Sequence, residues 1–182
     1  TDNSQRTWLV TKHGDLVQLD DDGGLRRMSL PENVHAMAIA NGDGGAHLLA
    51  RVGDTGSVLR VYRADSGRWT QVVERTIRTA TEFVGSPMIG VGAGSAVWAV
   101  VDVRRTDGEG TRTGGVVILD PAVETVTYLH RGATVAADGP GAMSIPDEIS
   151  GIDFSENNAW LATLEGAVRI GNSQAVVFGE AR

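Results

Sequence analysis

The stretch NNAWLATLEGAVRIGN, residues 157–172, reads as a polar turn, a short apolar strand led by Trp160, a turn at Gly166 and a second strand. The stretch RTWLVTKHGDLVQLD, residues 6–20, has the same features in the same order, and in both a tryptophan stands six residues ahead of a glycine. Short alternating or continuous apolar runs bounded by glycine turns are typical of β-strands. The two stretches therefore predict an internal repeat made of strands.

Two further units share this order, and the anchor residues of the four units are spaced by 40, 50 and 62 residues: Trp8, Leu48, Trp98 and Trp160. In each unit a glycine and an apolar strand follow the anchor strand, and a polar turn leads to another strand. Three units also have a strand ahead of the anchor. Units of four short antiparallel strands that recur at roughly 40 to 50 residues are typical of β-propeller blades.

We therefore expect an all-β fold of β-propeller-like repeats, with about four blades of four antiparallel strands each. Residues 1–182 are predicted to form a single propeller-like domain or a segment of a propeller. A β-sandwich or barrel is the alternative fold, and a helical face formed by Val73, Ile77, Ala80 and Val84 is the competing local pattern. Threonines and β-branched residues in that segment weaken the helical pattern.

The chain is rich in glycine, with 24 of 182 residues, and has five prolines, which favours many tight turns between short strands. The predicted strands are Trp8–Thr11, Leu16–Leu19, Leu25–Leu30, Val34–Ala40, His47–Val52, Val58–Tyr62, Trp69–Glu74, Pro87–Val91, Ala96–Val103, Val116–Leu119, Thr125–Leu129, Ile149–Phe154, Ala159–Thr163, Ala167–Ile170 and Ala175–Phe178.

The segment ISGIDFSENNAWLATLEGAVRIG, residues 149–171, resembles the repeat of bacterial sensor propellers found ahead of two-component histidine kinases. The segment SAVWAVVDV…TGGVVILDPAVETVTYL, residues 95–129, has the same pattern with a longer loop. The WD dipeptide of other propellers is missing, and so is a glycine pair in the register of the kelch repeat. The resemblance implies a propeller fold, a periplasmic or extracellular ligand side and a signalling protein as partner.

The first unit lacks the strand that precedes the anchor in the other three, so the sequence predicts nearly four blades. An open series of blades would expose the apolar faces of its terminal sheets. Three explanations stay open: the chain is a fragment of a longer propeller, it pairs with a second copy or another chain to complete a ring of about eight blades, or it forms a small ring alone.

The composition excludes several classes of function. The formal net charge is −7, which disfavours nucleic-acid and anionic-lipid partners because both need a positive field. The chain has no cysteine, which excludes a disulfide scaffold and a thiolate metal site. No apolar run approaches the roughly 20 residues that a membrane-spanning helix needs. We therefore expect no nucleic-acid partner and no membrane span in this chain.

Several short motifs raise the possibility of a metal or phosphate site. LDDDGG, residues 19–24, is predicted to be a hairpin turn, with Ca²⁺ binding as the alternative. GVGAGS, residues 90–95, is predicted to be a tight turn rather than a phosphate loop, because a strand follows it where a phosphate loop needs a helix. The histidines have no metal-binding spacing and are expected at the surface or in turns: His13, His35, His47 and His130. No metal or cofactor is predicted.

The segment DVRRTDGEGTRTGG, residues 102–115, contains three arginines: Arg104, Arg105 and Arg112. Guanidinium groups donate paired hydrogen bonds that suit carboxylate and phosphate. On an acidic chain this cluster is the best candidate for binding a protein partner or a small anionic ligand. The alternative is an ordinary solvated loop.

The tryptophans that lead the repeat units are expected to pack between blades, and Trp69 is a freer candidate for stacking on a ligand. No serine elbow supports a nucleophile. We therefore predict a non-enzymatic recognition or sensing module, with a protein–protein interaction scaffold as one alternative. The enzyme alternative is a hydrolase or lyase with acidic residues at the propeller mouth, to which four residues could contribute: Asp102, Asp107, Asp147 and Glu148.

Overall fold

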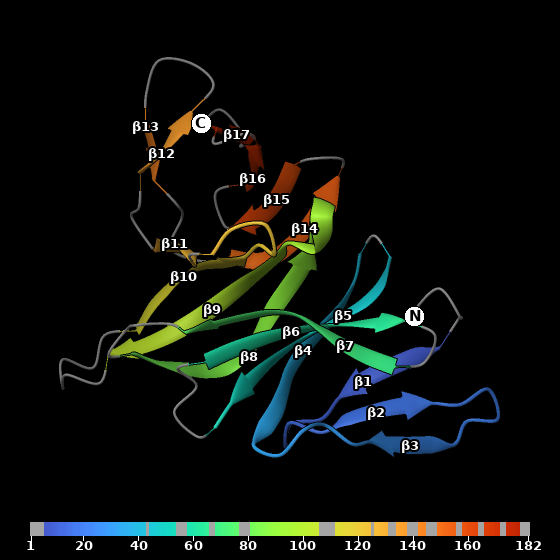
Figure 1. Ribbon diagram of the computed structural model, residues 1–182. Helices are drawn as coiled ribbons and strands as arrows, with labels where there is room; N and C mark the ends of the chain where they lie inside the picture. Colours follow the sequence, from blue (N-terminus) through green and yellow to red (C-terminus); the bar gives the residue numbers. More distant parts are fainter. Residues whose placement is uncertain are drawn as a thin grey trace.

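The computed structural model describes residues 6–42, 44–53, 58–65, 68–76, 81–105, 112–124, 126–130, 134–137, 142–144, 149–155, 158–163, 166–171 and 174–178. For residues 81–86, 101–105, 112–115, 127–130, 134–137, 142–144, 171 and 174–178 the description covers the backbone alone. Regular structure in these ranges is β-strand, apart from the single-turn 3-10 helix η1 (Ala93–Ser95). The strands form four sheets that follow one another in chain order (Figure 1).

The first and second sheets are meanders in which each strand pairs antiparallel with the next strand along the chain. The turns on either side of β2 contain Gly14 and Gly23, whose φ angles of 82° and 83° favour glycine. The strands are β1 (Thr7–Val10), β2 (Leu16–Leu19) and β3 (Leu25–Met28) in the first sheet, and β4 (Val34–Gly42), β5 (Gly45–Val52), β6 (Val58–Asp65) and β7 (Arg68–Thr76) in the second.

The third and fourth sheets repeat this meander, and the fourth is extended by a hairpin. In that hairpin β12 pairs parallel with β17 and antiparallel with β13, so β12 lies beside β17 and β13 forms the edge of the sheet. The strands are β8 (Thr81–Val91), β9 (Val97–Arg105), β10 (Arg112–Leu119) and β11 (Thr127–His130) in the third sheet, and β12 (Thr134–Ala137), β13 (Ala142–Ser144), β14 (Ile149–Ser155), β15 (Asn158–Thr163), β16 (Gly166–Gly171) and β17 (Gln174–Phe178) in the fourth.

An apolar cluster fills the space between each pair of successive sheets. Trp8 and Leu16 of the first sheet pack with Leu48 of the second. The opposite face of the second sheet packs on the third, and the opposite face of the third packs on the fourth. The second and third sheets are therefore buried on both faces, which a two-layer sandwich does not require of any sheet.

Successive side chains along a strand point to opposite faces of the sheet, and in the second sheet the side chains on both faces are buried. In β5 the side chain of Leu48 lies toward the first sheet, and that of Leu49 lies toward the third. A bulge in β4, between Ala36 and Ala38, inserts one residue and reverses the alternation. Met37 then packs toward the third sheet and Ile39 toward the first. Continuous apolar runs are thus what a sheet with two covered faces needs.

The sheets approach one another most closely at their first strands, where β1 contacts β4, β4 contacts β8 and β8 contacts β14. We call β4, β8 and β14 the inner strands. Away from them, Arg75 of β7 donates hydrogen bonds to the carbonyl oxygens of Val123 and Asp120, in the turn between β10 and β11. The first and fourth sheets lie at opposite ends of the series, and the described residues do not close a ring (Figure 1).

The structure confirms the prediction of an all-β chain built from four antiparallel sheets. The helical alternative is wrong in the part described, because Val73 lies in β7 and Val84 lies in β8; residues 77–80 are outside the described ranges. The insertion between β11 and β14 contains the hairpin of β12 and β13, where the sequence predicted no strand. The assignment of residues 1–182 to a single domain stays a prediction.

Candidate functional site

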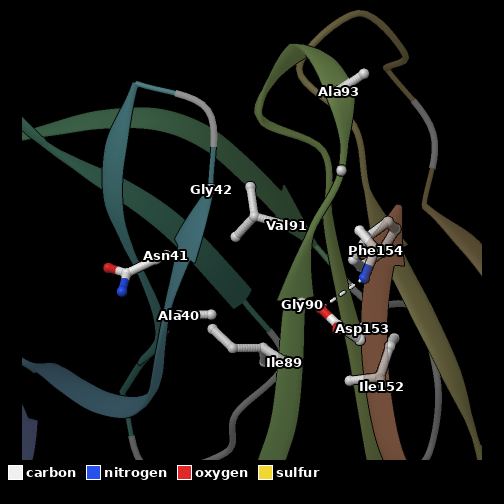
Figure 2. Close-up of a pocket in the computed structure, with 11 residues that line it drawn as sticks. Ala40, Asn41, Gly42, Ile89, Gly90, Val91, Ala93, Ile152, Asp153 and Phe154 are labelled. Carbon is white, nitrogen blue, oxygen red and sulfur yellow. Dashed lines mark hydrogen bonds between the residues drawn. The ribbon is translucent and has the colours of Figure 1, made fainter. Parts of the chain in front are cut away.

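A pocket of about 460 Å³ lies where the inner strands come together. Its volume falls within the range of about 300–1,000 Å³ that is usual for sites of small ligands. Figure 2 shows the end of β4 on one side of β8 and Phe154 of β14 on the other. Each inner strand contributes residues to the lining: Ala40, Asn41, Gly42, Ile89, Gly90, Val91, Gly92, Ala93, Ile152, Asp153 and Phe154.

Glycines allow the inner strands to approach closely around this pocket. A Cβ atom on Gly42 would lie 2.3 Å from Cγ1 of Val91, and a Cβ atom on Gly90 would lie 2.4 Å from Cε2 of Phe154. Real Cβ atoms do not make such short contacts, so these two positions require glycine for close approach of the strands. The Phe154 ring in turn meets Trp98 edge to face, with ring centroids 5.6 Å apart.

Few polar side chains line the pocket, and much of its polar surface comes from the backbone. Asp153 is the one carboxylate among the described lining residues, and its Oδ1 accepts a hydrogen bond of 2.8 Å from the backbone N–H of Phe154 (Figure 2). Asn41 also borders the pocket, but its side chain points away from β8 (Figure 2). Within the described sheets each inner strand is an edge strand, with one partner, so its second edge offers backbone N–H and C=O groups to this side of the molecule.

The GVGAGS turn forms one wall of the pocket. It contains η1 and connects β8 to β9, closed by a 2.8 Å hydrogen bond from the N–H of Gly92 to the carbonyl of Ala96. Gly94 and Ser95 have φ angles of 68° and 66°. The prediction of a tight turn between strands is confirmed, and the sequence analysis missed that this turn borders a pocket.

The three arginines of the predicted binding site flank the loop at the end of one hairpin. Arg104 and Arg105 end β9, and Arg112 begins β10. In the backbone register Arg104 is directly opposite Arg112, and on its other side it is opposite Glu82 of β8. The side chains of these residues, and residues 106–111 between the strands, lie outside the described part of the structure. Their role in binding stays a prediction.

The acidic motif LDDDGG forms the predicted hairpin turn between β2 and β3. The carboxylate of Asp22 accepts a 3.0 Å hydrogen bond from the N–H of Gly24, and that of Asp20 accepts one of 2.8 Å from Gln18 Nε2. Of the four acidic residues suggested for an enzyme, Asp102 lies in β9 with its backbone alone described, and the others are outside the described residues: Asp107, Asp147 and Glu148. Nowhere in the described ranges do three possible ligands gather around a metal position.

The histidine prediction was wrong at one position. His47 is fully buried in β5, where its Nδ1 lies 3.0 Å from the carbonyl oxygen of Gly45, while His13 is exposed in the turn after β1. Only the backbone of His130 is described. In the residues that the structure covers, no helix has the length and apolar character needed to cross a membrane.

The prediction that the repeat-anchor tryptophans pack between sheets is confirmed for Trp8 and Trp98. For Trp160, which is half-buried in β15, it stays a prediction. Trp8 packs toward the second sheet and Trp98 toward the fourth, so each faces the sheet that follows its own. Leu48 faces the preceding sheet, so Leu49 is the residue of β5 that matches them. Trp69 was predicted to be freer, but it packs edge to face on Trp8, with ring centroids 5.1 Å apart.

Comparison with known proteins finds similarity to solved structures but to no established family. No protein-family model and no curated protein matches the sequence. The structure is similar to one described as PorZ, an essential bacterial surface component of the type-IX secretion system of Porphyromonas gingivalis. The TM-score is 0.42 and the sequence identity 14%, and the match covers 98% of this chain and 33% of that chain. This chain thus spans about a third of that protein's length.

Proposed function

We propose that this chain is a non-enzymatic recognition module with a β-propeller-like stack of blades, and that it binds anionic groups through the arginines of the hairpin of β9 and β10. The observation that carries the proposal is the backbone register, which sets Arg104 directly opposite Arg112. Residues directly opposite in an antiparallel pair have Cβ atoms about 4.5–5.5 Å apart. Arginines at two such positions can bind one anion together, which is the arrangement that the proposal requires.

The sheets supply the rigid support that recognition requires. Both faces of the third sheet are packed, since Val117 and Leu119 of β10 lie in the cluster with the second sheet and Val116 lies in the cluster with the fourth. A hairpin that leaves such a sheet is held at its base by packing on two sides. Loops positioned by a rigid scaffold are where binding residues concentrate in proteins of many folds.

The ligand chemistry follows from the charge. The chain has a net charge of −7, whereas in residues 102–115 the three arginines balance Asp102, Asp107 and Glu109, so this segment is less acidic than the chain as a whole. Guanidinium groups bind carboxylate and phosphate through two parallel hydrogen bonds, and the charged partner shortens and strengthens these bonds. A small anion and an acidic segment of a protein partner both supply this chemistry.

Binding to two probes tests the proposal and distinguishes the two sources of anion. Inorganic phosphate and a glutamate-rich peptide are each titrated into the protein by isothermal calorimetry at low and high salt. We expect saturable binding of at least one probe, and a loss of about tenfold or more in affinity when Arg104, Arg105 and Arg112 are all changed to serine. Binding of the peptide alone indicates a protein partner.

The matched control removes the same charge from exposed positions on other strands, by changing Arg26, Arg27 and Arg68 to serine. This variant should retain the affinity of the unchanged protein. If both triple variants lose affinity equally, the binding reflects net charge and the proposed site is wrong. If neither probe binds in low salt, the proposal of anion recognition fails.

The pocket of the inner strands supports recognition over the enzyme alternative. Acid–base cleavage of a glycosidic bond uses two carboxyl groups within about 10 Å of each other. Asp153 is the one carboxylate that the described lining supplies, and the remaining lining is mainly glycine and aliphatic residues. The sensing role, the signalling partner and the periplasmic or extracellular location are implied by the sequence resemblance. They predict that ligand binding changes the activity of a kinase or regulator encoded with this chain.

A further inference from the structure

The pocket at the inner strands has a negatively charged wall. Asp153 supplies the charge, and the described lining contains no arginine, lysine or histidine. The hydrogen bond from the N–H of Phe154 holds one carboxylate oxygen of Asp153 against β14. Figure 2 shows this carboxylate on the side of β14 that is nearer β8. A carboxylate has about four lone-pair sites, so one hydrogen bond leaves most of its capacity to accept for a ligand.

The remaining walls combine backbone acceptors with small apolar surfaces. Gly42, Gly90 and Gly92 can contribute only peptide groups to the lining. Ile89 and Val91 add aliphatic side chains. An ammonium group has three N–H donors and no acceptor, so a carboxylate together with carbonyl oxygens can satisfy it. The aliphatic walls suit a short carbon chain, as in most sites for small ligands.

The charge around the pocket also favours a cation. The chain has a net charge of −7, which attracts cations from solution. Gly90 is opposite Trp98, whereas Glu82 is opposite Arg104, so eight residues of β8 separate the pocket from the arginine hairpin. Eight residues of strand span roughly 25 Å. This length is several times the screening length of about 8 Å at physiological salt, so the arginines repel a cation in the pocket only weakly.

We propose that this pocket binds a small organic ammonium compound, a primary amine on a short apolar chain, through the carboxylate of Asp153. The ammonium group donates to Asp153 and to backbone carbonyl oxygens, and the carbon chain lies against Ile89 and Val91. The pocket volume of about 460 Å³ accommodates such a molecule. The inference does not rest on anion recognition by the arginines, because the two sites lie at opposite ends of the third sheet.

Nuclear magnetic resonance tests the proposal with n-butylamine as the probe and 1-butanol as its neutral counterpart of the same length. Each is titrated into the ¹⁵N-labelled protein at about pH 7, where an amine of this kind is protonated. We expect butylamine to shift the amide signals of Gly90, Gly92 and Phe154 saturably, with a dissociation constant in about the millimolar range. Butanol should bind at least about tenfold more weakly, and high salt should weaken the binding of butylamine alone.

Asp153→Asn removes the charge and keeps a side-chain oxygen that can accept from the N–H of Phe154. It should raise the dissociation constant for butylamine by at least about tenfold, because a hydrogen bond to a charged group is replaced by a neutral one. Asp21→Asn is the matched control. Asp21 is an exposed carboxylate in the turn between β2 and β3, outside the pocket lining, so this variant loses the same charge and should retain the affinity.

Three results would overturn the proposal. These are the absence of saturable shifts at the pocket amides with butylamine, equal affinity for butanol, and equal affinity of the Asp153→Asn and unchanged proteins. Equal losses in Asp153→Asn and Asp21→Asn would also overturn it, since the binding would then reflect net charge. Asp153→Asn should leave the binding of phosphate and of the glutamate-rich peptide unchanged, so failure at the pocket is distinguishable from failure at the arginines.

Discussion

The second sheet and the first sheet are built from similar residues but are covered differently. In β5 the consecutive residues Leu48 and Leu49 are both fully buried, one toward each neighbouring sheet. In the first sheet Trp8 is buried on one side, while Leu9 and Leu25 are exposed on the other. The stability that a leucine contributes to this fold therefore depends on whether its face of the sheet is covered by a neighbouring sheet. Its place in the repeat does not decide this contribution.

The largest expected effect comes from truncating leucines in the two sheets. Leu49→Ala should lower the free energy of unfolding by about 2–5 kcal/mol, because it leaves a cavity between the second and third sheets. Leu25→Ala should change it by no more than about 0.5 kcal/mol, the usual range for an exposed position. Urea denaturation followed by circular dichroism measures both variants.

The two leucine variants test directly whether the first sheet is less covered than the second. Equal losses for Leu49→Ala and Leu25→Ala would mean that the first sheet is covered as fully as the second.

The next largest loss of stability is expected from replacing a glycine of the inner strands. Gly90→Ala should cost about 1–3 kcal/mol, because the new methyl group overlaps the ring of Phe154, which Trp98 holds in place. Phe154→Ala removes the overlap, so the double variant should lose less than the sum of the two single losses, with a coupling of about 0.5–3 kcal/mol. Thermal unfolding of the four proteins completes the cycle.

Gly151 provides the matched control for this cycle. It lies in β14 with a φ outside the left-handed region, and a Cβ atom there would make an ordinary contact of 3.5 Å with Ala162. Gly151→Ala should therefore be neutral or stabilising by up to about 1 kcal/mol. Additive losses for Gly90→Ala and Phe154→Ala would show that the third and fourth sheets do not meet through this contact.

Much of the fold was predictable because alternation and turn chemistry are local. The meanders follow from short apolar runs separated by glycine turns, and the two-sided sheets show as continuous runs such as HLLARV, residues 47–52. The hairpin of β12 and β13 was missed because its position depends on parallel pairing with β17, a contact between distant segments. The sequence analysis took Leu48 as the anchor of the second unit, whereas Leu49 is the residue that faces the following sheet. The local sequence could not distinguish the two, because they are adjacent residues of the same type.

The candidate sites were less predictable than the fold. The pocket is lined by residues from three units that lie far apart in the sequence, and its glycines have no motif that separates them from turn glycines. The burial of His47 has the same origin, because polar residues in a two-sided sheet are covered by neighbours that the local sequence does not reveal. The arginine cluster could be found because its three members lie close together in the sequence, in a single insertion between two strands.

A smaller effect is expected where the second and third sheets meet away from the inner strands. Arg75 donates to the carbonyl of Val123 at 2.6 Å from Nη2 and 3.2 Å from Nε, which connects β7 to the turn after β10. Arg75→Met should cost about 0.5–1.5 kcal/mol, the usual net value of a hydrogen bond, because the group is partly solvated. Arg75→Lys should lose part of this, since it retains the charge without the planar fork. Arg68→Met on the same strand is the control and should be neutral in the same denaturation experiment.

The smallest expected effect is at the ion pair of Arg60 and Glu74, which are opposite each other in β6 and β7. Arg60 Nε lies 2.5 Å from Glu74 Oε2, and the side chains are 24% and 44% exposed. Glu74→Gln should cost about 0.2–1 kcal/mol, and this loss should shrink in high salt.

The pH dependence sharpens that last prediction. The hydrogen bond from Arg60 to Glu74 raises the pKa of the Arg60 guanidinium above its ordinary value. A raised pKa in the folded state contributes stability that is complete below the unfolded pKa and is lost only as the pH rises through the folded one. The difference in unfolding free energy between the unchanged protein and Glu74→Gln should therefore be the same at about pH 7 and about pH 9. A difference that falls between these two values would mean that another group, with a pKa in this interval, contributes to the contact between β6 and β7.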